Sequence, residues 1–157
     1  MIYWIDCPGP GRLATMARPR AGDWLEDEIA RWRDDGLSLV VSLLEDHEIA
    51  ELGLQEEPTL CQSSGIEFAR LPIVDRGVPD SLMQASELAD DIARRVSAGQ
   101  SIAIHCRAGI GRSSLLAALV LRKLGRDTAT AFADISNARG LDVPDTSDQR
   151  QWVEAWR

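Results

Sequence analysis

The sequence predicts an α/β fold, with a central and mainly parallel sheet flanked by helices on both sides. Short strand-like runs alternate along the chain with apolar residues at helical spacing, as in proteins built on a parallel sheet. The run LSLVVSLL at 37–44 is almost continuously apolar, which is typical of a strand buried on both faces. A length of 157 residues predicts a single domain over 1–157, large enough to fold without a disulfide or a metal.

The first half of the chain is expected to hold four strands and three helices. Two short strands flank a loop rich in proline and glycine at 7–11, and Asp23 is expected to cap a helix that stops at Gly36. The expected strands lie at 2–5, 13–16, 37–44 and 66–73, and the expected helices at 24–35, 46–53 and 57–64.

The second half is expected to hold one strand and four helices. Ser81 is expected to cap a long helix that runs to about residue 98, with Gly99 ending it. The strand is expected at 101–105, and the other helices at 111–124, 128–139 and 147–156.

Charge argues against two classes of partner. The chain carries 17 basic and 25 acidic residues, a net charge of -8, whereas binding to nucleic acid or to an anionic membrane needs many Lys and Arg side chains. No apolar run approaches the roughly 20 residues of a membrane span. The opening MIYWIDCPGPG lacks the basic start and the apolar stretch of a secretory signal. We therefore expect a cytoplasmic monomer that binds neither nucleic acid nor membrane.

The cysteines and histidines indicate neither a disulfide framework nor a zinc site. Cys7, Cys61 and Cys106 are odd in number and widely spaced, and His47 and His105 form no metal-ligand pair. We expect no metal and no cofactor. Cys7 and Cys61 are expected to be small buried apolar residues, and whether either pairs with Cys106 on oxidation stays open.

The most informative segment begins at the end of the strand at 101–105 and reads HCRAGIGRS. A strand runs into a tight loop with two glycines, and an apolar helix follows at once. Such a loop turns several backbone N–H groups towards one point at a helix N-terminus, which creates an anion site. The residues expected to bind the anion, a phosphate, are Arg107, Ala108, Gly109, Ile110, Gly111 and Arg112.

Four side chains of this segment have expected roles. Cys106 is the candidate nucleophile, because a helix N-terminus and a nearby arginine favour its thiolate form. Arg112 offers a bidentate fork for two phosphoryl oxygens. Ser113 is expected to donate its hydroxyl to the sulfur when the thiolate leaves, and His105 to order the loop through hydrogen bonds.

The same segment resembles the signature His-Cys-x5-Arg-Ser/Thr of the protein tyrosine phosphatase superfamily, and it matches at every defined position. The short length and the motif at 72–79 look closest to small dual-specificity-like phosphatases, including kinase-associated phosphatase and its bacterial relatives. The resemblance covers about residues 37–156. It implies a cysteine-phosphatase fold and hydrolysis of phosphomonoesters through a phosphocysteine intermediate, without a cofactor.

The resemblance also implies a general acid and a residue that orients water. The acid is an Asp on a loop roughly thirty residues before the cysteine, and Asp75 lies 31 residues before Cys106. Asp80 is the alternative acid in the same loop. Gln149 stands where relatives place a Gln that helps to orient the hydrolytic water, although it also fits a plain residue of a helix first turn.

Two other functions of such a loop fit the sequence less well. A nucleotide P-loop would need Gly where Cys106 stands and Lys where Arg112 stands. A rhodanese-like sulfur transferase would need neither an acid upstream nor the return to an arginine. A phosphate-binding module without turnover stays open. The expected substrate is a phosphorylated protein or a small phosphomonoester; a phosphoinositide or an RNA 5′-phosphate is less favoured by the acidic net charge.

Overall fold

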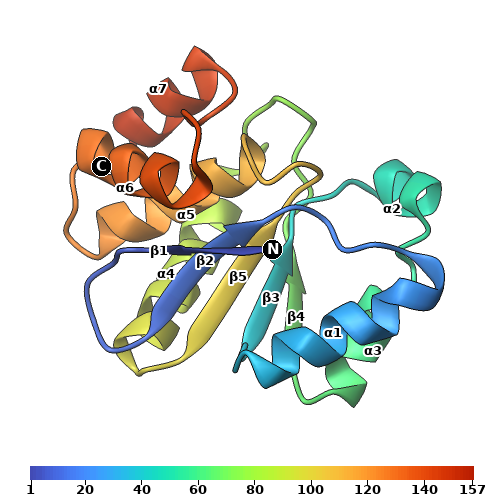
Figure 1. Ribbon diagram of the computed structural model, residues 1–157. Coiled ribbons are helices and arrows are strands. Elements are labelled where there is room, and N and C mark those ends of the chain that lie inside the picture. Colours follow the sequence, from blue (N-terminus) through green and yellow to red (C-terminus); the bar gives the residue numbers. More distant parts are fainter.

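The computed structural model describes residues 1–157 and contains one five-stranded sheet in the order β1-β2-β5-β3-β4 (Figure 1). Its strands are β1 (Ile2–Ile5), β2 (Arg12–Met16), β3 (Leu39–Ser42), β4 (Glu67–Arg70) and β5 (Ser101–His105). Only the edge strand β1 runs antiparallel to its neighbour; the other three pairings are parallel. The predicted, mainly parallel sheet is confirmed.

Helices cover both faces of the sheet, as predicted. One face carries α1 (Leu25–Asp34), α2 (Asp46–Leu52) and α3 (Glu57–Ser63), and the other carries α4 (Leu82–Ser97), α5 (Arg112–Lys123), α6 (Thr128–Arg139) and α7 (Ser147–Ala155) (Figure 1). None of these helices is long and apolar enough to cross a membrane.

Alternating side chains of the inner strands divide the core in two. In β5, Ile102 and Ile104 pack with α4 to α7, whereas Ala103 packs on the face of α1 and α3. In β3, Val40 points to the α1 face and its two neighbours in the strand point to the other. This period of two explains why these strands read as continuous apolar runs, since both of their faces are buried.

Two predicted strands prove shorter, and one predicted cap is wrong. The runs at 37–44 and 66–73 form strands only over Leu39–Ser42 and Glu67–Arg70, although the N–H of Ile73 still donates to the carbonyl of Leu43. Asp23 does not cap α1, because it lies inside a short 3₁₀ helix, η1 (Gly22–Trp24). The first turn of α1 instead carries three acidic residues, which favour the helix N-terminus through its dipole.

The carboxyl ends of β3, β4 and β5 meet at one edge of the sheet, because these strands are parallel neighbours. Three connections leave from this edge, at 43–45, 71–81 and 106–111. Ser81 caps the helix that follows the second connection, as predicted, by accepting a hydrogen bond from the N–H of Gln84. Ligand sites of open parallel sheets lie at such an edge.

Candidate active site

The loop at 106–111 joins the central strand β5 to the most deeply buried helix, α5. Cys106 follows β5 directly and its residue is 3% exposed. Arg112 and Ser113 begin α5, and Cys106 Sγ lies 3.4 Å from Ser113 Oγ, to which the thiol donates. The nucleophile, arginine and serine predicted from the sequence therefore lie together.

The carbonyl groups of the loop are held from outside. The N–H of Arg18 donates to the carbonyl of Arg107 over 3.1 Å. The guanidinium of Arg139 donates to the carbonyls of Gly109 and Ala108, over 3.2 and 3.3 Å. In contrast, the backbone N–H groups of residues 107–111 donate to no acceptor within the protein. The loop thus keeps a row of free donors for an anion.

Close approach requires glycine at position 109, and Gly111 also packs tightly. Gly109 has a φ of +72°, and a Cβ there would lie 2.7 Å from the carbonyl carbon of Met16. A Cβ at Gly111 would lie 2.6 Å from a carboxylate oxygen of Asp145. Only glycine at 109 lets the loop pack this closely against the backbone of β2, whereas a side chain at 111 would require the Asp145 side chain to move.

Arg112 is buried and bound on one side by a carboxylate. Its Nη1 lies 2.6 Å from Glu48 Oε1 and its Nη2 lies 3.0 Å from Glu48 Oε2, while Nη1 also donates to the carbonyl of Ile73. Burial alone would lower the pKa of Arg112, but the hydrogen bonds to Glu48 and the charges of Cys106, Glu48 and Asp75 raise it. The guanidinium is therefore cationic, and its Nε donates to no protein group.

Glu48 is the matching anion. Burial alone would raise the pKa of this carboxyl, but the hydrogen bonds from Arg112 and from the N–H of Glu45 lower it below its usual value. Sequence reasoning missed Glu48, because an acidic residue in the first turn of a helix is sufficiently explained by the helix dipole. The spacing gives no signal either, since Glu48 lies four residues before the apolar Leu52 but Glu45 likewise lies four residues before the apolar Ile49.

Asp75, and not Asp80, borders the loop. Asp75 Oδ1 lies 3.3 Å from Arg112 Nη2, and the Asp75 side chain is 57% exposed. Both residues lie on the connection after β4, but only Asp75 lines the cavity over Cys106. This cavity of about 190 Å³ is lined by Asp75, Arg76, Cys106, Arg107, Ala108, Ile110, Gly111, Arg112 and Asp145.

Asp145 is a second carboxylate at this cavity, and sequence reasoning did not single it out. It lies in the connection between α6 and α7 and packs against Gly111. Gln149, predicted as a supporting residue, does not line the cavity. Its amide nitrogen donates to the carbonyl of Gly77 over 3.0 Å, and its amide oxygen accepts from the N–H of Thr146 over 3.3 Å. Gln149 thus caps α7 and fastens the loop that carries Asp75.

His105 lies beneath the loop, away from the cavity. It is fully buried, with Nδ1 3.1 Å from the carbonyl oxygen of Cys106 and Nε2 2.7 Å from Glu57 Oε2. This matches the expected hydrogen-bonding role. Glu57, the first residue of α3, was missed by sequence reasoning, because the exposed Glu56 beside it also lies four residues before an apolar residue of the core, Leu60.

The other two cysteines lie apart from Cys106. Cys61 belongs to the core on the α1 face, whereas Cys106 belongs to the core on the opposite face. Burial raises the pKa of Cys61 to about 12. Burial also raises the pKa of Cys7, which lies in the connection between β1 and β2, at the far end of β5 from Cys106. No group of three or more His, Cys, Asp or Glu side chains is placed to hold a metal ion.

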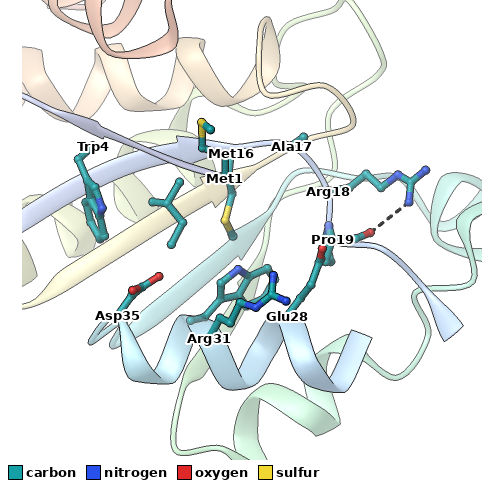
Figure 2. Close-up of a pocket in the computed structure, with 11 residues that line it drawn as sticks. Met1, Trp4, Met16, Ala17, Arg18, Pro19, Glu28, Arg31 and Asp35 are labelled. Atoms are coloured by element: carbon teal, nitrogen blue, oxygen red, sulfur yellow. Dashed lines mark hydrogen bonds between the residues drawn. The ribbon is translucent and has the colours of Figure 1, made fainter. Parts of the chain in front are cut away.

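A second, larger pocket lies between β1 and α1 (Figure 2). It measures about 310 Å³ and is lined mainly by apolar side chains such as Trp4 and Met16, with Arg31 and Asp35 among its charged residues. It contains neither a cysteine nor a histidine. Because it offers no nucleophile, the smaller cavity over Cys106 is the candidate reaction site.

A family model described as "Polymorphic toxin system, DSP-PTPase phosphatase" matches residues 14–126, from β2 to just beyond α5. The chain belongs to this DSP-PTPase family. It is a cysteine-dependent phosphatase of the protein tyrosine phosphatase superfamily, of the small dual-specificity type. The matched residues of the DSP-PTPase include Cys106, Arg112 and Asp75 but neither Asp145 nor Gln149.

Solved structures agree with the fold of this DSP-PTPase. Kinase associated phosphatase, with a serine in place of its catalytic cysteine, has a TM-score of 0.84 at 20% identity, covering 98% of this chain and 91% of that one. Tk-PTP in the active form has a TM-score of 0.76 at 29% identity, covering 98% and 95%. PTPMT1 has a TM-score of 0.79 at 22% identity, covering 98% and 92%. The predicted cysteine-phosphatase fold is confirmed.

Proposed function

We propose that this phosphatase hydrolyses phosphomonoesters in two steps, with Cys106 as the nucleophile. One observation carries the proposal: Cys106, Arg112 and Asp75 line the same cavity as a row of backbone N–H groups that have no protein acceptor. These are the parts that phosphoryl transfer requires, namely a nucleophile, an acid and fixed donors for the phosphoryl oxygens.

In the first step the Cys106 thiolate attacks phosphorus. The S–P bond forms as the P–O bond to the leaving group breaks, and the proton of Asp75 passes to the leaving oxygen. The N–H groups of residues 107–111 hold the phosphoryl oxygens. Arg112 contributes its Nε, because its other edge is occupied by Glu48.

In the second step water attacks the phosphocysteine. Asp75, now a carboxylate, accepts a proton from this water, and the S–P bond breaks to release inorganic phosphate and the thiolate. Ser113 stabilises the departing thiolate by donating its hydroxyl, which lies 3.4 Å from the sulfur. Gln149 supports both steps by fastening the Asp75 loop at Gly77.

The walls of the cavity favour a broad range of phosphomonoesters. None of the residues that line it is aromatic, so a phosphotyrosine ring has no ring to stack on. Arg107 is paired with Glu51 over 3.5 Å, and the carboxylates of Asp75 and Asp145 stand at the mouth. Arg76 also lines the cavity, so the disfavour for a phosphoinositide or an RNA 5′-phosphate rests on the net charge of -8, which supports a phosphorylated protein side chain or a small monoester. We further propose that residues 1–157 act as one domain and as a cytoplasmic monomer.

A substrate panel tests the proposal. Phosphate release is measured from para-nitrophenyl phosphate, a phosphotyrosyl peptide, a phosphoseryl peptide, a phosphoinositide and an RNA 5′-phosphate, with Cys106→Ser beside the wild type. We expect turnover of the first three and none by Cys106→Ser, which still binds the peptides. EDTA is expected to leave the rates unchanged. Activity of Cys106→Ser within about tenfold of the wild type, a loss of only ~1.4 kcal/mol, would overturn the assignment. Binding without turnover by the wild type would make the domain a binding module.

A further inference from the structure

We propose that Glu57 is a positioning residue of this phosphatase, and that it acts through His105 to aim the backbone N–H of Arg107 at the bound phosphoryl group. The inference rests on the proposed function of the Cys106 loop. It starts from a chain of contacts: Glu57 Oε2 lies 2.7 Å from His105 Nε2, and His105 Nδ1 lies 3.1 Å from the carbonyl oxygen of Cys106.

Both ends of the His105 ring face oxygen atoms, and the backbone carbonyl settles the role of Nδ1. A backbone carbonyl can only accept a hydrogen bond, so the proton on Nδ1 is donated to Cys106. Nε2 then meets the carboxyl of Glu57, either as a donor to the carboxylate or as an acceptor from the protonated acid. In both cases Glu57 holds the ring in the orientation in which the Nδ1 proton reaches the Cys106 carbonyl.

The Cys106 carbonyl and the Arg107 N–H belong to one peptide group. This group is planar and trans, so its C=O and its N–H point in opposite directions. Because His105 holds the carbonyl beneath the loop, the N–H of Arg107 is turned the other way. That N–H has no acceptor within the protein, and Cys106 and Arg107 both line the cavity. His105 thereby orients the first N–H group of the loop that can donate to a bound anion.

The buried carboxyl of Glu57 would destabilise the fold if it lacked its hydrogen bond to His105. The Glu57 side chain is 2% exposed and that of His105 is not exposed. A buried carboxyl without a partner is strongly destabilising, and His105 is the only side chain that forms a hydrogen bond with Glu57. Its neighbour Glu56, which precedes α3, is exposed and forms no such bond. Glu56 is therefore a matched control.

The test compares Glu57→Gln and Glu57→Leu with Glu56→Gln and the wild type. The first readout is kcat and KM for para-nitrophenyl phosphate. The second is the ratio of the rates at which iodoacetate, an anion, and iodoacetamide, a neutral reagent, alkylate Cys106. The alkylation ratio reports how well the loop attracts an anion, and a mere loss of stability would slow or speed both reagents alike.

We expect Glu57→Leu to lower kcat by about 10–100-fold, as the loss of other orienting hydrogen bonds does. We expect its alkylation ratio to fall with kcat. Glu57→Gln keeps a hydrogen bond to Nε2 and is expected to retain kcat and ratio within about threefold of the wild type, a change of less than ~0.7 kcal/mol. Glu56→Gln is expected to change neither.

A wild-type alkylation ratio in Glu57→Leu would overturn the inference, whatever happens to kcat. Should Glu57→Leu fail to fold, the double variant His105→Leu/Glu57→Leu takes its place, because it replaces the buried pair by apolar side chains. It is expected to show the lowered ratio, and a wild-type ratio in it would equally overturn the inference. If the wild type released no phosphate from any substrate, the proposed function would fail, while the alkylation ratio would still test Glu57.

Discussion

Glu48 and Arg112 form a bidentate ion pair in which neither side chain is more than 2% exposed. The two contacts, at 2.6 and 3.0 Å, fix the guanidinium plane from one edge before any substrate arrives. A donor that is already oriented loses little entropy when the phosphoryl group binds. Such positioning, together with electrostatic stabilisation, provides most of the rate enhancement in phosphoryl transfer. The pair therefore links the stability of the fold to the geometry of the site.

Removing Glu48 is expected to destabilise the protein strongly. Glu48→Leu leaves the Arg112 cation buried without its partner, and we expect the free energy of unfolding to fall by about 3–5 kcal/mol. Urea unfolding followed by circular dichroism measures it. Glu51→Leu, which removes an exposed carboxylate of the same helix, is the control and is expected to cost at most about 1 kcal/mol. Equal losses in both variants would contradict this prediction.

The same pair makes stability depend on pH on the acid side. The pKa of Glu48 is lowered in the folded protein from a usual value of 4.5, so the unfolded chain binds the proton more readily. Its stabilising contribution is present above about pH 4.5 and is lost as the pH falls through the lower pKa of the folded state. We expect the melting temperature of the wild type to fall more steeply below this pH than that of Glu48→Gln. Parallel curves for the two proteins would show that Glu48 does not titrate in this way.

Replacing Asp75 is expected to give a loss that depends on the leaving group. General acid catalysis contributes about 10²–10⁴-fold, so Asp75→Asn should lose that much with an alkyl or tyrosyl phosphate and much less with an activated aryl phosphate. The basic limb of its pH–rate profile should vanish, because no protonated acid is needed. Asp80→Asn, which does not line the cavity, should change little. The opposite result for the two variants would assign the acid to Asp80.

Peroxide is expected to inactivate the enzyme reversibly without an internal disulfide. The sulfur of Cys7 accepts a hydrogen bond from the backbone N–H of Leu13. Leu13 pairs with Ile102, and Ile102 lies roughly 13 Å along the strand from Cys106. A disulfide needs Cα atoms within about 7 Å. Cys61 lies in the other core, and its pKa of about 12 keeps it a thiol. Mass spectrometry after mild oxidation should find no Cys106 linkage within the chain; finding one to either cysteine would refute this prediction.

The sequence predicted the parts of the site that are contiguous. Cys106, Arg112 and Ser113 follow from a strand, a glycine loop and a helix start within one short segment, so local pattern determines their placement. Asp75 was predicted from its position 31 residues before Cys106. The two buried carboxylates were not predicted, because Glu48 and Glu57 meet the loop only after α2 and α3 pack against the sheet. Nothing local distinguishes them from the acids beside them, because Glu45 and Glu56 likewise lie four residues before apolar residues of the core, Ile49 and Leu60.

The strand that carries the loop is inserted into the middle of the sheet. Arg12 in β2 contacts Ser101 in β5, 89 residues later, and β3 lies on the other side of β5. During synthesis at about 5–20 residues per second, β2 therefore waits roughly 4–18 s for its partner. Over that interval the sheet lacks its central strand, so β2 and β3 in the nascent chain expose the edges that β5 later covers. The residues that follow β5, including Phe132 and Val153 of the core, then pack against the completed sheet.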